Sequence, residues 1–110
     1  MPLSSIFMHV FVYITASSED EAKKIARHLL EKKLAACVNI FPIRSFFWWE
    51  GKIEEAEEYG MIVKTRAEKF AKLREEVKKI HSYSVPCVCS VPIERGLREF
   101  LEWIDESLEA

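Results

Sequence analysis

The chain has 110 residues, of which 49% are hydrophobic and 31% are charged, and its formal net charge is -2. This length provides one modest hydrophobic core, so we expect a single domain spanning residues 1–110. The slight acidic excess argues against a general surface for nucleic acid or for an anionic membrane, because such surfaces need clustered basic residues.

The first 18 residues contain no Lys, Arg, Asp or Glu, which raises the question of a signal peptide. They lack the basic start of a signal peptide, and they are too short and too polar at their end to span a bilayer. They are typical instead of a strand that leads into a helix cap. We therefore expect an unprocessed cytoplasmic protein with no membrane segment.

Residues 6–15 are expected to form the first strand. Its even positions are all aliphatic: Ile6, Met8, Val10, Val12 and Ile14. Its odd positions are aromatic or partly polar: Phe7, His9, Phe11, Tyr13 and Thr15. Alternate side chains of a strand point to opposite faces. The aliphatic face suits packing under helices, and the aromatic face suits a protein–protein contact.

A first helix follows a predicted capping box formed by Ser18 and Glu21. Its expected buried stripe has helical spacing and comprises Ala22, Ile25, Ala26, Leu29 and Leu30. Residues 34–41 are predicted as the second strand, which Pro42 interrupts as at a bulge or sheet edge. Extended chain resumes over 43–49, turns at 50–52 and returns over 53–65 as a long, projecting hairpin.

Four consecutive aromatic residues, Phe46 to Trp49, precede the turn. A strand places two of these rings on each face of the sheet, whereas a small soluble monomer usually leaves one sheet face wet. The segment therefore indicates that the chain assembles with copies of itself.

Thr65 and Glu68 suggest a second capping box, before a helix whose buried stripe is Phe70, Leu73, Val77 and Ile80. A loop at 81–84 leads to a strand over 86–93, and Gly96 precedes a third helix. That helix carries the apolar residues Leu97, Phe100, Leu101, Ile104 and Leu108, while Trp103 is either a surface aromatic or an interface anchor.

The resulting order is β-α-β-β-α-β with an extra C-terminal helix. Right-handed crossovers predict an α+β, ferredoxin-like split βαβ fold, in which an antiparallel four-stranded sheet carries both main helices on one face. The other face stays bare unless the third helix or another subunit covers it.

Five segments, taken in this order, resemble the CutA divalent-cation tolerance family: 34–39 (LAACVN), 49–54 (WEGKIE), 64–65 (KT), 81–86 (HSYSVP) and 101–104 (LEWI). The resemblance implies a tight homotrimer whose architecture is similar to that of PII-type signalling proteins. It also implies a link to tolerance of copper and other divalent metals. The sequence departs from the family pattern at Ser82, at Ile14 and at Ile80, so His81 alone matches a copper-ligand set that the family uses.

His81 is thus the candidate ligand for copper or another divalent cation. The alternatives are a cationic cap at the helix end and a side chain hydrogen-bonded in a subunit cleft. We expect Cys37, Cys87 and Cys89 to be reduced and to pack in the core, although a trimer axis could gather three copies of one cysteine. The run of Glu54, Glu55, Glu57 and Glu58 suits a solvated acidic edge better than a calcium loop.

Glu50, Lys64, His81 and Tyr83 are expected near an intersubunit cleft. No catalytic arrangement stands out among the motifs, so we expect no enzyme. The leading hypothesis is a non-enzymatic homotrimer that binds divalent metal ions, copper first, and contributes to metal tolerance. The alternatives are a PII-like sensor that binds an anionic metabolite in the cleft, and a structural trimer that serves as an assembly platform.

Overall fold

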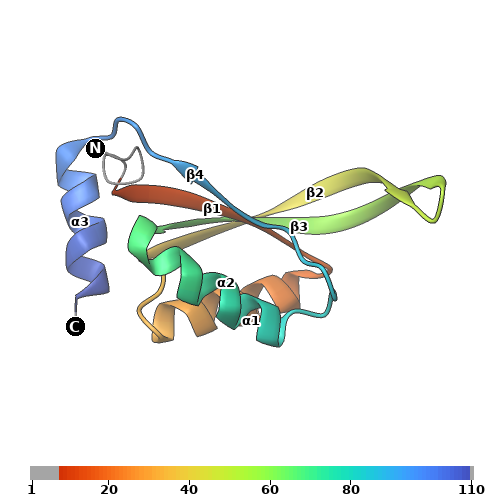
Figure 1. Cartoon of the computed structure of the whole chain (residues 1–110), viewed down its shortest axis with the longest axis horizontal. Helices are drawn as coiled ribbons and strands as arrows, with labels where there is room; N and C mark the ends of the chain where they lie inside the picture. Colours follow the sequence, from red (N-terminus) through yellow and green to blue (C-terminus); the bar gives the residue numbers. More distant parts are fainter. Residues whose placement is uncertain (1–7, 110) are drawn as a thin grey trace.

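A computed structural model describes residues 8–109, and its elements follow the predicted order (Figure 1). They are β1 (His9–Ala16), α1 (Glu19–Glu31), β2 (Cys37–Trp49), β3 (Lys52–Arg66), the short 3-10 helix η2 (Ala67–Lys69), α2 (Phe70–Ile80), β4 (Val88–Pro92) and α3 (Arg98–Leu108). The strands lie in the order β2-β3-β1-β4, and each neighbouring pair is antiparallel. With α1 and α2 on one face, this confirms the predicted α+β, ferredoxin-like fold.

The core lies between the sheet and these two helices. We term the sheet surface that the two helices cover the helix face. Val10, Val12 and Ile14 of β1 are buried there, as the alternation predicts. Met8, just before β1, is half-exposed, and the predicted strand residues Ile6 and Phe7 lie outside the described part of the chain. The other buried core residues come mainly from the helices and β3: Ala22, Ile25, Ala26, Leu29, Met61, Val63, Leu73 and Val77.

At the start of α1, only one of the two hydrogen bonds of the predicted capping box is formed. The Glu21 amide donates to the Ser18 hydroxyl at 3.1 Å, as expected. The Glu21 carboxylate, however, accepts from the Ser17 amide rather than from that of Ser18. Leu30 was wrongly assigned to the buried stripe, because it is 39% exposed.

The second strand differs from its prediction at both its start and its proline. Lys33 adopts a positive φ of 58°, and the Leu34 amide bonds to the Leu29 carbonyl, so this segment closes α1 and β2 begins only at Cys37. The expected interruption at Pro42 is wrong, because β2 continues through it with Pro42 opposite Tyr59, but the sheet edge predicted there is confirmed. Because β2 is an edge strand, a residue without an N–H is tolerated there.

The hairpin of β2 and β3 projects beyond the rest of the sheet, as predicted (Figure 1). Only Tyr59–Arg66 of β3 pair with β1, whereas the earlier residues of β3 pair with β2 alone. Glu50 and Gly51 both have positive φ, of 49° and 77°, and form a two-residue turn. This is one residue tighter than the expected turn, and positive φ at both positions suits the twist of the flanking strands.

The predicted cap at Thr65 is wrong. Thr65 lies within β3 opposite Val10, is fully buried, and donates its hydroxyl to the Leu34 carbonyl at 2.8 Å. The chain then forms η2 before α2 begins at Phe70, later than the proposed capping box would place it. The predicted last strand is also shorter than expected, because only Val88–Pro92 pair with β1.

The sheet surface opposite α1 and α2, which we term the second face, is only partly covered. Helix α3 lies over one end of it, where Asp105 accepts hydrogen bonds from His9 and Arg66. Phe11 remains 36% exposed and Val91 55% exposed. The register places the following described residues on this face: Phe11, Tyr13, Cys37, Phe41, Phe47, Glu58, Gly60, Ile62, Lys64, Cys89 and Val91.

Gly60 allows the ring of Phe41, its partner on β2, to approach β3 closely. A Cβ at position 60 would stand 2.6 Å from one ring carbon of Phe41 and 2.9 Å from another. We therefore expect Gly60→Ala to lower the free energy of unfolding by about 1 kcal/mol or more, because crowding a packed site is destabilising. Urea unfolding measures this change. The double variant with Phe41→Leu should recover part of the loss, and a single variant as stable as the parent would contradict the packing argument.

Candidate functional site

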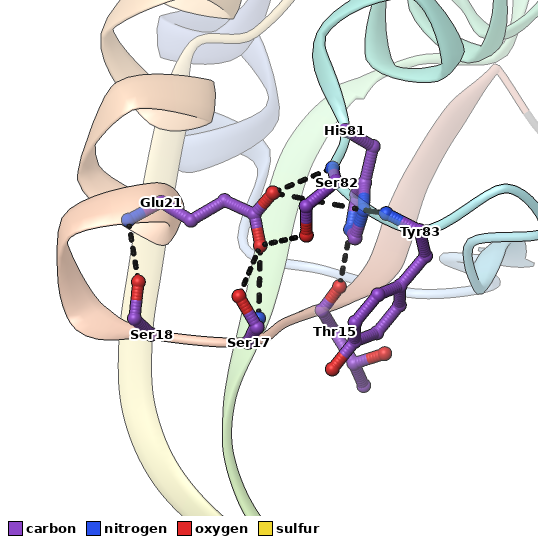
Figure 2. Close-up of polar contacts among 7 residues, drawn as sticks. All are labelled: Thr15, Ser17, Ser18, Glu21, His81, Ser82 and Tyr83. Atoms are coloured by element: carbon purple, nitrogen blue, oxygen red, sulfur yellow. Dashed lines mark hydrogen bonds and ion pairs between the residues drawn. The ribbon is translucent and has the colours of Figure 1, made fainter.

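His81 lies at the end of α2, and its imidazole is enclosed by the chain itself (Figure 2). The Thr15 carbonyl can only accept, so Nε2 of His81 donates to it, at 2.7 Å. The Tyr83 amide donates to Nδ1 at 3.0 Å. The ring is therefore held as the tautomer with its proton on Nε2, and both nitrogens are engaged within the chain. A metal could bind at Nδ1 only after the Tyr83 amide moved away.

Glu21 ties the start of α1 to the loop that follows His81. Its carboxylate accepts from the amide and hydroxyl of Ser17, both at 2.9 Å. It also accepts from the amide and hydroxyl of Ser82, at 2.7 and 3.0 Å. Figure 2 shows these bonds converging on one side chain from two segments that are far apart in the sequence. We refer to Glu21, Ser17 and Ser82 as the Glu21 clamp.

These four bonds change the acidity of Glu21. Burial alone would raise the pKa of the carboxyl group. The hydrogen bonds from Ser17 and Ser82 act in the opposite direction and outweigh burial, so the pKa falls from 4.5 to about 2. The clamp therefore carries a negative charge at every physiological pH, with His81 Nδ1 at 3.8 Å from one carboxylate oxygen.

A second carboxylate lies beside two tyrosines on the second face. Glu58 of β3 is only 8% exposed. Burial, followed by the nearby Glu58 carboxylate, raises the pKa of Tyr83. Burial, followed by Cys87 and Glu58, likewise raises the pKa of Tyr13. Both phenols thus stay protonated at neutral pH.

The expected core packing of the cysteines is wrong for the single chain. Cys37 and Cys87 are partly exposed, and Cys89 is exposed. The cause is their position on the second face or beside it, which α1 and α2 do not cover. The ammonium group of Lys64 lies 3.7 Å from the Cys37 sulfur.

The structure brings together two of the four predicted cleft residues. His81 and Tyr83 have ring centroids 4.9 Å apart. Lys64 lies near the end of β3, within 5.8 Å of the Phe100 ring of α3. Glu50 occupies the hairpin turn, at the other end of β3. A site that includes all four residues therefore requires a neighbouring chain.

Sequence reasoning missed the clamp and the buried Glu58. Glu21 was identified only as a helix cap, because no local pattern links it to Ser82, which is 61 residues away. Glu58 was grouped with the solvated carboxylates of the hairpin. The available signal was that Glu57 and Glu58 are successive residues of a strand, and successive side chains face opposite sides of the sheet.

Within residues 8–109, no group of three or more His, Cys, Asp or Glu side chains is arranged to hold a metal ion. None of the helices in that range is long and apolar enough to cross a membrane.

The fold and the partly uncovered second face define a ferredoxin-like α+β protein with an extended hairpin. The CutA1 divalent ion tolerance protein family matches residues 10–107, and the chain belongs to this family. The divalent-cation tolerance protein CutA of Archaeoglobus fulgidus is 72% identical over 102 residues, which are 93% of this chain and 100% of that protein. That of Thermotoga maritima is 42% identical and covers 90% of this chain and 98% of its own length.

Solved structures agree with the family assignment. The structure described as the periplasmic divalent cation tolerance protein CutA from Archaeoglobus fulgidus has a TM-score of 0.91 at 72% identity, and the match covers 93% of this chain and all of that one. The Thermus thermophilus divalent cation tolerance protein has a TM-score of 0.88 at 44% identity, covering 91% and 98% of the two chains. The predicted family is thereby confirmed.

Proposed function

We propose that the chain is a non-enzymatic homotrimer that binds divalent metal ions, copper first, and contributes to metal tolerance in the cytoplasm. Residues 1–110 would form one domain of each subunit. The observation that carries the assembly is the second face, which α3 covers at one end only and which leaves Phe11, Val91 and Phe47 exposed. A PII-like trimer would cover this surface with copies of the same chain.

The divalent ion is suggested by the names of the relatives, which are divalent-cation tolerance proteins. Because residues 8–109 contain no cluster of three His, Cys, Asp or Glu ligands, the proposed site would have to draw ligands from more than one subunit. His81 is the proposed copper ligand, through Nδ1 once the Tyr83 amide is displaced. Glu50, Lys64 and Tyr83 are the proposed cleft residues, and Glu50 would come from a neighbouring hairpin.

Calorimetric titration with Cu(II) and Zn(II) tests the role of His81. We expect the reduced wild-type protein to bind Cu(II), and His81→Ala to weaken binding by about tenfold or more, because losing even an outer partner of a metal ligand costs that much. His28→Ala is the matched control. His28 is hydrogen-bonded to Glu76 at 2.8 Å, away from Thr15 and Tyr83, so this variant should bind Cu(II) normally.

Circular dichroism must show that the His81→Ala variant is folded, because the substitution removes two internal hydrogen bonds. Wild-type protein that fails to bind Cu(II), or equal binding by the two histidine variants, would remove the metal role assigned to His81.

A second candidate function is binding of an anionic metabolite in the cleft. Its support is Lys64, which forms no ion pair with any residue in the range 8–109 and lies on the second face beside Cys37. A thermal-shift screen of nucleotides and organic acids distinguishes this candidate, since a stabilising anion should lose its effect in Lys64→Met.

A further inference from the structure

The two oxygens of the Glu21 carboxylate have different surroundings. Oε1 accepts three hydrogen bonds, from the amide and hydroxyl of Ser17 and from the hydroxyl of Ser82. Oε2 accepts one hydrogen bond from residues 8–109, which comes from the Ser82 amide at 2.7 Å. An ionised carboxylate oxygen has two acceptor positions, so Oε2 keeps one that no hydrogen bond from this range occupies.

Oε2 lies beside the imidazole of His81 (Figure 2). It is 3.8 Å from Nδ1, the ring nitrogen that accepts from the Tyr83 amide. Burial opposes ionisation of Glu21, but its hydrogen bonds outweigh burial and lower the pKa to about 2, so Oε2 shares a full negative charge at neutral pH. Once the Tyr83 amide moves away, an anionic oxygen and an unprotonated nitrogen face each other at this position.

We propose that Glu21 is the second protein ligand, through Oε2, of the divalent cation that His81 binds. This inference rests on the proposed metal-binding function and adds a ligand to it. Zinc binds imidazole nitrogen and carboxylate oxygen at about 2.0–2.2 Å, so one such ion joins ligand atoms that lie up to about 4.3 Å apart. The separation of 3.8 Å between Oε2 and Nδ1 therefore fits a shared cation.

The Glu21 clamp keeps this ligand in place before the cation arrives. The bonds to Oε1 fix the carboxylate, and a cation at Oε2 uses the acceptor position that remains, so all four clamp bonds persist. The one hydrogen bond that has to break is that of the Tyr83 amide, next to the clamped Ser82. A ligand that is already ordered loses little conformational freedom on binding, which favours affinity. Water or a neighbouring subunit supplies the remaining ligands.

Calorimetric titration of the reduced full-length protein with Cu(II) and Zn(II) tests the role of Glu21. Glu21→Gln should weaken binding by about tenfold or more, because losing even an outer partner of a metal ligand costs that much. The electron paramagnetic resonance spectrum of bound Cu(II) should also differ between the wild type and Glu21→Gln, since the variant replaces an anionic ligand with a neutral amide. Circular dichroism checks that the variant is folded.

Three control variants separate metal ligation from support of the fold and from simple loss of charge. Ser17→Ala and Ser82→Ala each remove one hydroxyl bond to Oε1 and leave Oε2 with its bond from the Ser82 amide. Asp20→Asn removes one negative charge from the exposed neighbouring residue. All three variants should bind Cu(II) with the wild-type affinity and spectrum.

Equal binding by the wild type and Glu21→Gln would overturn the assignment of Glu21. A loss in any of the three control variants as large as that in Glu21→Gln would do the same, because it would assign the effect to the fold or to charge. If His81→Ala weakens binding and Glu21→Gln does not, the role of Glu21 alone is wrong and the proposed function stands. If the wild type binds neither ion, both are wrong.

Discussion

Phe11→Glu is expected to convert the proposed trimer into single chains of 12.9 kDa. Phe11 is 36% exposed at a central strand of the second face, between Lys64 of β3 and Val91 of β4. Assembly would bury only the exposed third of Phe11, which contributes about 0.5–1 kcal/mol, and the loss would occur once in every subunit. A carboxylate there would in addition be desolvated by the neighbouring chain. Sedimentation equilibrium measures the change in mass.

Leu30→Glu is the matched control for this prediction. Leu30 is 39% exposed, almost the same as Phe11, but it lies on α1, on the helix side of the molecule. The same charge introduced there should leave the proposed trimer intact. If Phe11→Glu remains trimeric, or if both variants dissociate alike, the second face is not the assembly surface.

Glu21→Gln is expected to lower the free energy of unfolding by about 1–2 kcal/mol at pH 7, because four hydrogen bonds to a carboxylate become bonds to a neutral amide. This expected loss is at the low end of the range for hydrogen bonds to charged acceptors, because solvent reaches part of the clamp and screens the charge. The amide must also turn its NH2 group toward donors. Urea unfolding of the two proteins gives the difference.

The effect of Glu21→Gln should depend on pH in a defined direction. The pKa of Glu21 is about 2 in the folded chain and near 4.5 when unfolded. A lowered pKa gives stabilisation that is present above pH 4.5 and is lost as pH falls toward 2. The gap between wild type and variant should therefore close over this window. The hydrogen bond from His28 and the neighbouring lysines also lower the pKa of Glu76 to about 2. Glu76 is present in both proteins, so its protonation changes the stability of both by the same amount and does not alter the gap.

Glu31→Gln provides the control for the clamp. Glu31 is an exposed residue at the end of α1, so its loss should change stability little at any pH. A gap between wild type and Glu21→Gln that is absent at pH 7, or that widens on acidification, would show that the clamp does not stabilise the fold.

Much of the fold could be predicted because local patterns agree with tertiary packing. The alternation of Val10, Val12 and Ile14 identified the helix face, and Ser18 marked the start of α1. Thr65 misled the prediction because its hydroxyl suits a helix cap as well as a buried strand. Its partner is the Leu34 carbonyl, 31 residues away, which no local pattern reveals.

The candidate site was harder to predict, for the same reason. His81 and Tyr83 are close in sequence, and the structure does bring them together. The carbonyl of Thr15 and the carboxylate of Glu21 reach His81 only because the ends of β1 and α2 meet (Figure 2). The exposure of the cysteines depended on which face of the sheet the helices cover, and hydrophobic neighbours in the sequence could not specify that.

Sedimentation equilibrium of the unmodified, reduced protein at micromolar concentration is the most direct test. A well-folded species with three times the mass of the 12.9 kDa chain is the expected result, since the proposed self-association would hide the exposed Phe11 and Val91 from water. A stable, folded single chain at that dilution would contradict the account, and the shared cleft proposed for Glu50, Lys64, His81 and Tyr83 would no longer be possible.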